Sequence, residues 1–308
     1  MKGQGLRTFD FSTMYTTLDQ DDLIDKIGKV IEEAFSHRNA ERLSMSFGSR
    51  KPQWLRAGRE SHTPKHHTFT VEGLKDLVRY VVKNTYLCNG GKVVHQQVGL
   101  PMGTNAAGDL ANLYLYFYES RFMDKLMETN QDKAQAWHIS FRYIDDFLSV
   151  DNPESATCLV KPLEEGGMYP IRTHGLNILP SNTDTGHCTY LGLHLSMTGS
   201  SIVSKVYDKR ASYPFRLRNY PDMRSNIPGS VARGVFTSQL YRFARSCTFA
   251  LDFVTEAGRL AAKLRRQGYT RTTLCRLYKS FISANAPIRY RRCNLHLIRA
   301  FCSYLPCG

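Results

Sequence analysis

The sequence lacks the long apolar runs that a membrane-spanning helix requires. No stretch of about 18 or more apolar residues occurs in the chain, whereas a helix that crosses a bilayer needs about 20. Residues 1–7 also lack the apolar core of a secretory signal peptide. We therefore expect an intracellular protein without a membrane partner, and the sequence leaves nucleus and cytoplasm equally open.

Closely spaced cysteines are also missing. The eight cysteines of the 308 residues are scattered, and no two of them form a Cys-x-x-Cys motif. Cys293, His296, Cys302 and Cys307 could be considered as zinc ligands, but their spacing fits no common zinc finger. A disulfide framework is therefore not expected, and reduced thiols are the default for an intracellular chain.

Acidic residues are scarce in the last third of the chain. Residues 205–308 contain 20 Lys and Arg but four Asp and Glu, a net charge of +16, whereas residues 1–204 contain 21 and 23, a net charge of −2. Together they give the +14 of the whole chain. So basic a segment is typical of a surface that binds a polyanion, with nucleic acid the leading candidate and an anionic membrane surface the second.

Two adjacent aspartates, Asp145 and Asp146, lie between short apolar runs rich in β-forming residues. The segment 139–150 predicts a tight hairpin that presents both carboxylates at its tip. An ordinary solvated turn is the simpler explanation of a lone Asp-Asp pair, because Asp is common in turns. Upstream, the alternation of apolar and polar residues over 6–11 predicts a short strand that ends at Asp10. We expect Asp10 to meet the hairpin tip, so that three carboxylates hold divalent metal.

The rest of the pattern predicts an α+β lobe with a largely antiparallel sheet, followed by a separate helical lobe. Helices are expected near 23–35, 74–82, 110–118 and 154–165 and again from 228, and strands near 92–98, 170–179, 188–197 and 201–208. Residues 36–68 lack clear periodicity and are interpreted as an inserted loop or hairpin. Asp19, Asp21 and Asp22 precede the first helix and are interpreted as caps of its positive end.

Four stretches resemble, in the same order, the motifs of reverse transcriptases. Residues 9–15, with Asp10 and an aromatic residue five positions later, resemble the first palm motif, and residues 97–104 resemble the Pro-x-Gly loop that supports template and nucleotide. Residues 143–146 are similar to the Tyr-x-Asp-Asp box, and residues 189–193 lie where the family has its primer grip. The resemblance implies a polymerase right-hand palm, an antiparallel sheet with packed helices.

The resemblance covers about residues 5–210 and implies two domains. Residues 1–208 would form the palm, with the inserted region at about 36–68, and residues 209–308 would form a basic, α-helical thumb. Nine residues precede Asp10, so the N-terminal fingers of the family, whose basic residues clamp the triphosphate, are expected to be missing.

Two later segments resemble a subgroup of the family. Residues 206–210 and Asn226-Ile227-Pro228 resemble the segment directly after the palm in Penelope-like retroelements. The chain departs from the family pattern at Ala107-Gly108, where a Ser-Pro or Ala-Pro pair is usual, and it has no recognisable endonuclease segment.

The resemblance implies an RNA-directed DNA polymerase of a retroelement, which joins a dNTP to a primer 3′-hydroxyl on an RNA or DNA template. Such nucleotidyl transfer uses two Mg²⁺ ions, with Mn²⁺ as a substitute. Asp10 and Asp145 would bridge the ions. Asp146 would be an auxiliary ligand, and the backbone carbonyl of Phe11 would complete one site. Without metal, two carboxylates about 4 Å apart repel by about 4 kcal/mol at an effective dielectric of about 20, so the site should bind cations or protons.

The resemblance also implies roles for residues around the carboxylates. Tyr15 would be the gate beneath the ribose 2′ position that favours dNTPs, with an ordinary core tyrosine as the alternative. The other assignments are nucleotide contacts at Pro101, Met102 and Gly103, a primer grip at Tyr190, Leu191 and Gly192, and nucleic-acid contacts at Lys205, Lys209, Arg210, Arg242 and Arg245.

Two other functions stay open at this point. A catalytically incompetent, nucleic-acid-binding remnant of such a polymerase would agree with the expected lack of fingers. An RNA-directed RNA polymerase would use rNTPs, and the ring of Tyr15 argues against it.

Overall fold

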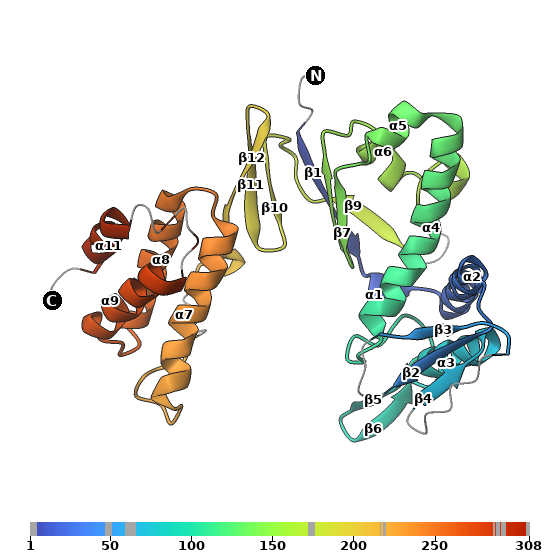
Figure 1. Cartoon of the computed structure of the whole chain (residues 1–308), viewed down its shortest axis with the longest axis horizontal. Helices are drawn as coiled ribbons and strands as arrows, with labels where there is room; N and C mark the ends of the chain where they lie inside the picture. Colours follow the sequence, from blue (N-terminus) through green and yellow to red (C-terminus); the bar gives the residue numbers. More distant parts are fainter. Residues whose placement is uncertain are drawn as a thin grey trace. The chain divides into compact units, whose positions relative to one another are not determined.

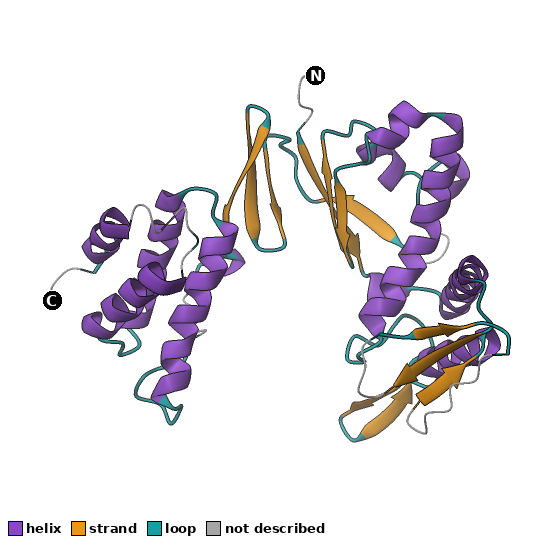
Figure 2. Cartoon of the chain, in the orientation of Figure 1, coloured by secondary structure: helices purple, strands orange, loops and turns teal. Residues whose placement is uncertain are grey.

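Two compact units make up the chain. The computed structural model describes residues 5–46, 51–58, 66–171, 176–215, 217, 220–285, 287, 290 and 294–305. One unit, here called the N-terminal unit, is Arg7–Ser181, and the other, the C-terminal unit, is Met1–Leu6 with Asn182–Gly308. Figures 1 and 2 show the helices and strands of each unit, which we describe in turn.

A four-stranded sheet forms the centre of the N-terminal unit. Its strand order is β7 (Ser140–Tyr143), β8 (Asp146–Val150), β1 (Leu6–Ser12) and β9 (Asn177–Pro180). β7 and β8 pair antiparallel, as do β1 and β9, where Asp10 lies opposite Leu179. The predicted hairpin over 139–150 is therefore confirmed, and the predicted strand that was to end at Asp10 continues to Ser12.

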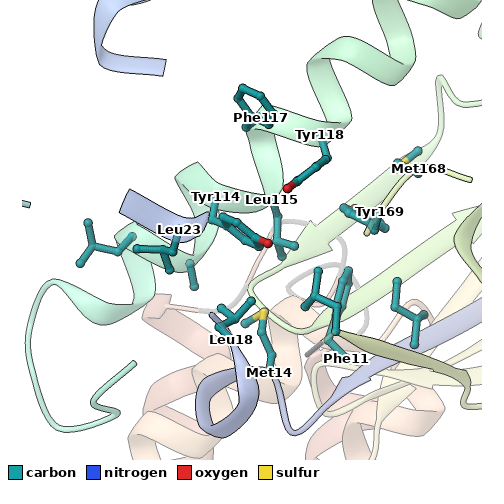
Figure 3. Packing of buried hydrophobic residues seen from close by; sticks show 14 of the residues in the cluster. Phe11, Met14, Leu18, Leu23, Tyr114, Leu115, Phe117, Tyr118, Met168 and Tyr169 are labelled. Carbon is teal, nitrogen blue, oxygen red and sulfur yellow. The ribbon is translucent and has the colours of Figure 1, made fainter. Parts of the chain in front are cut away.

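Helices cover this sheet and share one core with it. They are α1 (Met14–Thr17), α2 (Gln20–Arg38), α3 (Val71–Lys83), α4 (Ala107–Thr129), α5 (Gln131–Gln135), α6 (Ser155–Val160) and the 3₁₀ turn η1 (Leu163–Glu165). Figure 3 shows the core, where Phe11 of β1, Leu23 of α2 and Tyr114 of α4 lie together with Tyr169. Burying a large apolar side chain contributes about 1.5–3 kcal/mol, so this shared core fixes α4 and the sheet relative to each other.

The start of α2 corrects one interpretation of the acidic cluster. Asp19 caps the helix, accepting hydrogen bonds from the amides of Asp21 (2.8 Å) and Asp22 (2.9 Å). The carboxylate of Asp22 instead accepts the hydroxyls of Tyr114 (2.7 Å) and Tyr118 (3.0 Å) and thereby joins α2 to α4. The capping interpretation was wrong for Asp22, because a local pattern does not show partners about 90 residues away.

Residues 36–69 contain the three strands of a second sheet. β2 (Arg42–Ser46) lies between β3 (Gln53–Leu55) and β4 (His66–Phe69), and both pairings are antiparallel. Trp54 of β3 packs edge-on against Phe35 of α2, with ring centroids 5.2 Å apart. The expected loop or hairpin was too simple, because strands of three to five residues give weak periodicity.

A hairpin follows α3 in the N-terminal unit. Thr70 caps α3 as expected, since its hydroxyl accepts the amide of Gly73 at 3.1 Å. β5 (Tyr86–Asn89) and β6 (Lys92–His95) then pair antiparallel across a Gly-Gly turn. The predicted strand over 92–98 therefore ends at His95, and the residues beyond it lead into the Pro-x-Gly loop.

The C-terminal unit begins with a three-stranded antiparallel sheet. Its strands are β10 (His187–Tyr190), β11 (Leu193–Thr198) and β12 (Ser201–Val206), paired in that order. The single strand expected over 188–197 is two strands, because Leu191 and Gly192 both adopt left-handed backbone angles (φ 47° and 74°) and reverse the chain. A two-residue turn with both φ values positive matches the twist of a hairpin.

Helices complete the C-terminal unit. They are the 3₁₀ turn η2 (Lys209–Ser212), α7 (Gly229–Ser246), α8 (Ala250–Arg265), α9 (Arg271–Ser280), the π-helical η3 (Phe281–Asn285) and α11 (Asn294–Ser303). Stacked rings fill their core. The ring centroids of Tyr278 and Phe301 are 3.9 Å apart, and those of Phe253 and Tyr290 are 4.9 Å apart.

The predicted boundary at residue 208 falls inside the C-terminal unit, and the division of palm from thumb stays a prediction. Within the described part of the chain, no helix combines the length and apolar character needed to cross a bilayer.

Candidate active site

The end of β1 meets the start of β8 at the predicted carboxylates. The two strands are neighbours in the central sheet, and the amide of Phe11 donates a hydrogen bond to the carbonyl of Asp145 at 3.0 Å. Covalent geometry then limits the distance between the Cα atoms of Asp10 and Asp145 to about 8 Å. Both aspartates are half-buried. The fold therefore brings the backbones of two aspartates that are far apart in the sequence close together.

The turn between β7 and β8 presents one of the two adjacent aspartates. Tyr143 pairs with Asp146, so Ile144 and Asp145 form the turn, and Asp146 is the first residue of β8. The expectation that both carboxylates occupy the tip is corrected to Asp145 alone. Ile144 has a φ of 56°, which a β-branched side chain rarely adopts because its Cβ crowds the backbone. Such strain persists where the surroundings hold it in place, and it is common at functional sites.

Arg142 supplies much of that support from the strand before the turn. Its guanidinium donates to the carboxylate of Glu119 on α4 (2.5 and 3.2 Å), to the side chain of Asn112 (2.6 Å) and to the carbonyl of Ile144 (3.3 Å). The hydroxyl of the buried Tyr169 donates to the same carboxylate at 2.7 Å. Burial, followed by the charge of Glu119, holds the pKa of Tyr169 well above its usual value.

Sequence reasoning missed this network around Arg142. The only local signal was an arginine directly before the Tyr-x-Asp-Asp box, and its partners lie 23 and 30 residues away in the chain. The network joins the hairpin to α4, and so it determines the position of Asp145 relative to the helix.

The carboxylates offer hard oxygen ligands for a divalent cation. Among the described residues no three His, Cys, Asp or Glu side chains are grouped closely enough to form a metal site. The predicted trio of Asp10, Asp145 and Asp146 therefore does not form such a group. Two carboxylates on neighbouring strands still fit Mg²⁺, which proteins often bind through one or two carboxylates, with water and substrate phosphates supplying the rest.

Tyr15 lies beside this site. A Cβ on Gly108, at the start of α4, would be 3.9 Å from the Tyr15 hydroxyl and 3.6 Å from Cδ1 of Ile144. The small residue therefore lets the helix approach both side chains. Burial, and then the charges of Asp145 and Tyr143, raise the pKa of Tyr15 above its usual value. The ring is partly buried against the core, and both its gate role and its role as a core residue stay open.

Backbone hydrogen bonds attach the Pro-x-Gly loop to the segment that carries Tyr15. The amide of Leu100 donates to the carbonyl of Tyr15 at 2.7 Å, and the amide of Gly99 donates to the carbonyl of Leu18 at 2.8 Å. Gly99 has a φ of 79°, and a Cβ there would lie 2.2 Å from the Tyr15 oxygen. Only glycine fits this position, so the loop is positioned closely against the site.

The three predicted nucleotide contacts in the loop differ in exposure. Pro101 is buried, whereas Gly103 is exposed and the side chain of Met102 is 72% exposed. A flexible, exposed methionine can adapt to an apolar ligand surface. Met102 and Gly103 are thus accessible to a nucleotide, whereas the buried Pro101 is not exposed to one.

The predicted primer-grip residues belong to the C-terminal unit. Leu191 and Gly192 form the β10–β11 turn, and the carbonyl of Gly192 accepts the amide of Tyr207 at 2.9 Å. A Cβ on Gly192 would lie 3.0 Å from a guanidinium nitrogen of Arg242. Two of the residues predicted to contact primer and phosphate therefore lie against each other.

The predicted basic contacts lie in the same unit and are exposed. Lys205, Arg210 and Arg242 line one pocket, which Lys209 and Arg245 do not line. Arg210 also pairs with Asp208 at 2.8 Å. The predicted phosphate contacts thus divide into a group that shares a pocket and a pair on the surface outside it.

Comparisons with known proteins show the fold. No protein-family model matches the chain, and no curated protein matches its sequence. Among solved structures, telomerase from Candida albicans, determined with a TWJ fragment of telomeric RNA, aligns with a TM-score of 0.54 at 14% identity, over 97% of this chain and 44% of that chain. Apo telomerase from Candida tropicalis aligns with a TM-score of 0.44 at 14% identity, over 97% of this chain and 46% of that chain.

The likeness to the Candida albicans structure confirms the expected fold at a coarse level. The chain has a reverse-transcriptase-like fold of the α+β class, with antiparallel sheets and a C-terminal helical region. It spans less than half the length of the telomerase chains that it matches. At 14% identity the likeness carries neither an activity nor a subgroup.

Proposed function

We propose that the chain is the catalytic part of an RNA-directed DNA polymerase. The observation that carries the proposal is the hydrogen bond from Phe11 to Asp145, which places Asp10 beside the turn of the Tyr-x-Asp-Asp box in a reverse-transcriptase-like fold. In this proposal Asp10 and Asp145 bind divalent cations, Mg²⁺ or Mn²⁺, together with the carbonyl of Phe11. Asp146 is an auxiliary ligand.

The residues around the carboxylates orient the substrates in this reaction. When bound, the cations would lower the pKa of the primer 3′-hydroxyl and neutralise the leaving pyrophosphate. The ring of Tyr15 excludes a ribose 2′-hydroxyl, and Met102 contacts the new base pair. Tyr190, Leu191 and Gly192 hold the primer backbone. The basic helices bind duplex phosphates, which positions the duplex without reading its sequence.

Primer extension by the full chain tests the activity. We expect incorporation of dTTP on poly(rA)/oligo(dT) with Mg²⁺ or Mn²⁺, and loss of incorporation in the Asp145→Asn variant. Asp124→Asn is the matched control, because Asp124 is an exposed aspartate in the middle of α4. Extension that survives Asp145→Asn would remove Asp145 from the mechanism.

A second candidate is a nucleic-acid-binding protein without catalysis. It is favoured by the lack of a three-carboxylate group among the described residues and by the net charge of +16 over residues 205–308. This candidate predicts that the chain binds primer–template. The logarithm of the association constant should fall with the logarithm of the salt concentration, with a slope of about −0.9 for each phosphate neutralised. Salt-sensitive binding with no extension under any metal would favour it over the polymerase.

Retroelement origin is a separate part of the proposal. It is supported by the resemblance of residues 206–210 and Asn226-Ile227-Pro228 to Penelope-like elements. Many dispersed copies of the coding sequence in the source genome would agree with this origin, and a single-copy locus would contradict it.

A further inference from the structure

A second concave site lies entirely within the C-terminal unit. It is a pocket of about 780 Å³ between the β11–β12 hairpin and helices α7 and α8. Small-molecule sites commonly measure about 300–1,000 Å³. Six cationic side chains line it: Lys205, Arg210, Arg242, Arg259, Lys263 and Arg266.

Only part of this positive charge is neutralised within the pocket. Asp208 pairs with Arg210 (2.8 Å) and Lys263 (3.3 Å), and Glu256 pairs with Arg259 (2.6 Å). These two are the only carboxylates in the described lining, so the pocket has a net charge of +4. Concentrated positive charge in a concave site attracts anionic ligands.

Three of the six cationic side chains are not paired with a carboxylate of any described residue. Lys205, Arg242 and Arg266 form no salt bridge with any described residue. They come from three elements, β12, α7 and the end of α8, and their side chains converge on one cavity. Charge-assisted hydrogen bonds from Lys and Arg are strong with phosphate oxygens.

Most of the rest of the pocket wall is aromatic or apolar, and His194 and Gln239 are its other polar residues. Tyr207 and Tyr220 contribute rings, and Phe243 and Leu260 contribute apolar surface. A ligand that suits both parts of the wall carries several phosphates and a flat ring. Cations that bind an extended strand are usually arranged in a row along a groove, whereas these surround one cavity.

We propose that this pocket binds a nucleoside polyphosphate at a site distinct from the carboxylates of the N-terminal unit. The phosphates contact Lys205, Arg242 and Arg266, and the base lies against the Tyr207 and Tyr220 side of the wall. The proposal does not depend on polymerase activity.

Calorimetry on the full chain tests the site with ATP and inorganic tripolyphosphate as probes. EDTA and the Asp145→Asn background keep metal-dependent binding at the carboxylates out of the measurement. We expect saturable ATP binding that weakens with salt, and weaker binding of tripolyphosphate, which lacks the base. Lys205→Gln, Arg242→Gln and Arg266→Gln should each reduce ATP affinity about tenfold, since each removes a charge-assisted hydrogen bond.

Arg276→Gln is the matched control, because Arg276 is an exposed arginine on α9 outside the pocket lining. It should leave ATP affinity unchanged. Lys205, Arg242 and Arg266 are themselves exposed, and unchanged thermal unfolding would show that their variants fold. Absence of ATP binding to the parent protein, or pocket variants that bind ATP like the control, would overturn the proposal. So would variants that bind ATP normally and lose single-stranded poly(rU), because the pocket would then belong to a strand-binding groove.

Discussion

The amide of Phe11 and the carbonyl of Asp145 form a 3.0 Å hydrogen bond that joins the end of one strand to the turn of a hairpin. This contact holds the backbone of Asp10 close to that of Asp145, and both residues carry carboxylate side chains. Like charges held together in a half-buried site lower stability until a cation neutralises them.

Replacing one carboxylate with a neutral amide should therefore abolish activity without lowering the free energy of unfolding. In EDTA, the free energy of unfolding of Asp145→Asn should equal that of the parent protein or exceed it by about 1 kcal/mol, because repulsion is relieved. Added Mg²⁺ or Mn²⁺ should stabilise the parent, by about 2.7 kcal/mol at a concentration of one hundred times Kd, and should have little effect on the variant. Denaturant titration with and without metal, at constant ionic strength, measures both effects.

The control for this experiment is Asp124→Asn, which should respond to metal like the parent protein. A parent protein whose stability does not change with metal, or an Asp145→Asn variant that still gains stability from it, would contradict a cation site at these carboxylates.

Gly99 and Gly103 provide a matched pair in the Pro-x-Gly loop. Gly99→Ala would introduce a Cβ 2.2 Å from the Tyr15 carbonyl oxygen at a φ of 79°. We expect the free energy of unfolding to fall by at least about 2 kcal/mol, since both the left-handed backbone and the contact are unfavourable. A Cβ on Gly103 would have no atom of the described chain within 4 Å, so Gly103→Ala should have little effect on stability. Equal denaturation midpoints for the two variants would show that the loop is not held against Tyr15.

The sequence patterns predicted those parts of the site that depend on neighbouring residues. The hairpin that carries Asp145 and the cap at Thr70 follow from local alternation and helix-start chemistry. The position of Asp10 beside Asp145 was expected only because both matched ordered motifs of one family. Periodicity alone does not determine which strands become neighbours.

The remaining errors concern partners distant in sequence. The small sheet around β2 pairs Leu43 with Phe69, and each strand is too short to give a clear pattern on its own. Asp22 was interpreted as a helix cap from its position at the start of α2. Its tyrosine partners on α4 lie more than 90 residues away, and a local pattern does not reveal them. The support of the hairpin by Arg142 and Glu119 was missed for the same reason.

Arg142 should be the side chain on which the hairpin most depends. Arg142→Gln removes a mostly buried ion pair and leaves Glu119 with the hydroxyl of Tyr169 as its remaining partner in the network. We expect a loss of about 2–4 kcal/mol in the free energy of unfolding, with extension activity lost as well because the turn moves. Tyr169→Phe removes one hydrogen bond and should cost about 1 kcal/mol.

A double-mutant cycle distinguishes this network from simple loss of packing. Arg142→Gln combined with Glu119→Gln should be less destabilising than the sum of the two single changes, because the uncompensated charge is removed. Strict additivity would mean that the two side chains act independently, and the hairpin would then owe its position to other contacts.

Tyr15 allows a direct test of sugar choice. If its ring lies beneath the ribose, Tyr15→Ala should raise kcat/KM for rNTPs relative to dNTPs by roughly ten- to a hundredfold, because removing the ring makes room for the 2′-hydroxyl. Tyr15→Phe keeps the ring and should keep the dNTP preference. The preference should also be constant between about pH 7 and 9, since burial and the nearby charge of Asp145 raise the pKa of Tyr15 above its ordinary value of about 10 and the hydroxyl stays protonated. If Tyr15→Ala loses stability but keeps the dNTP preference, Tyr15 is a core residue and the selection of sugar must come from another part of the site.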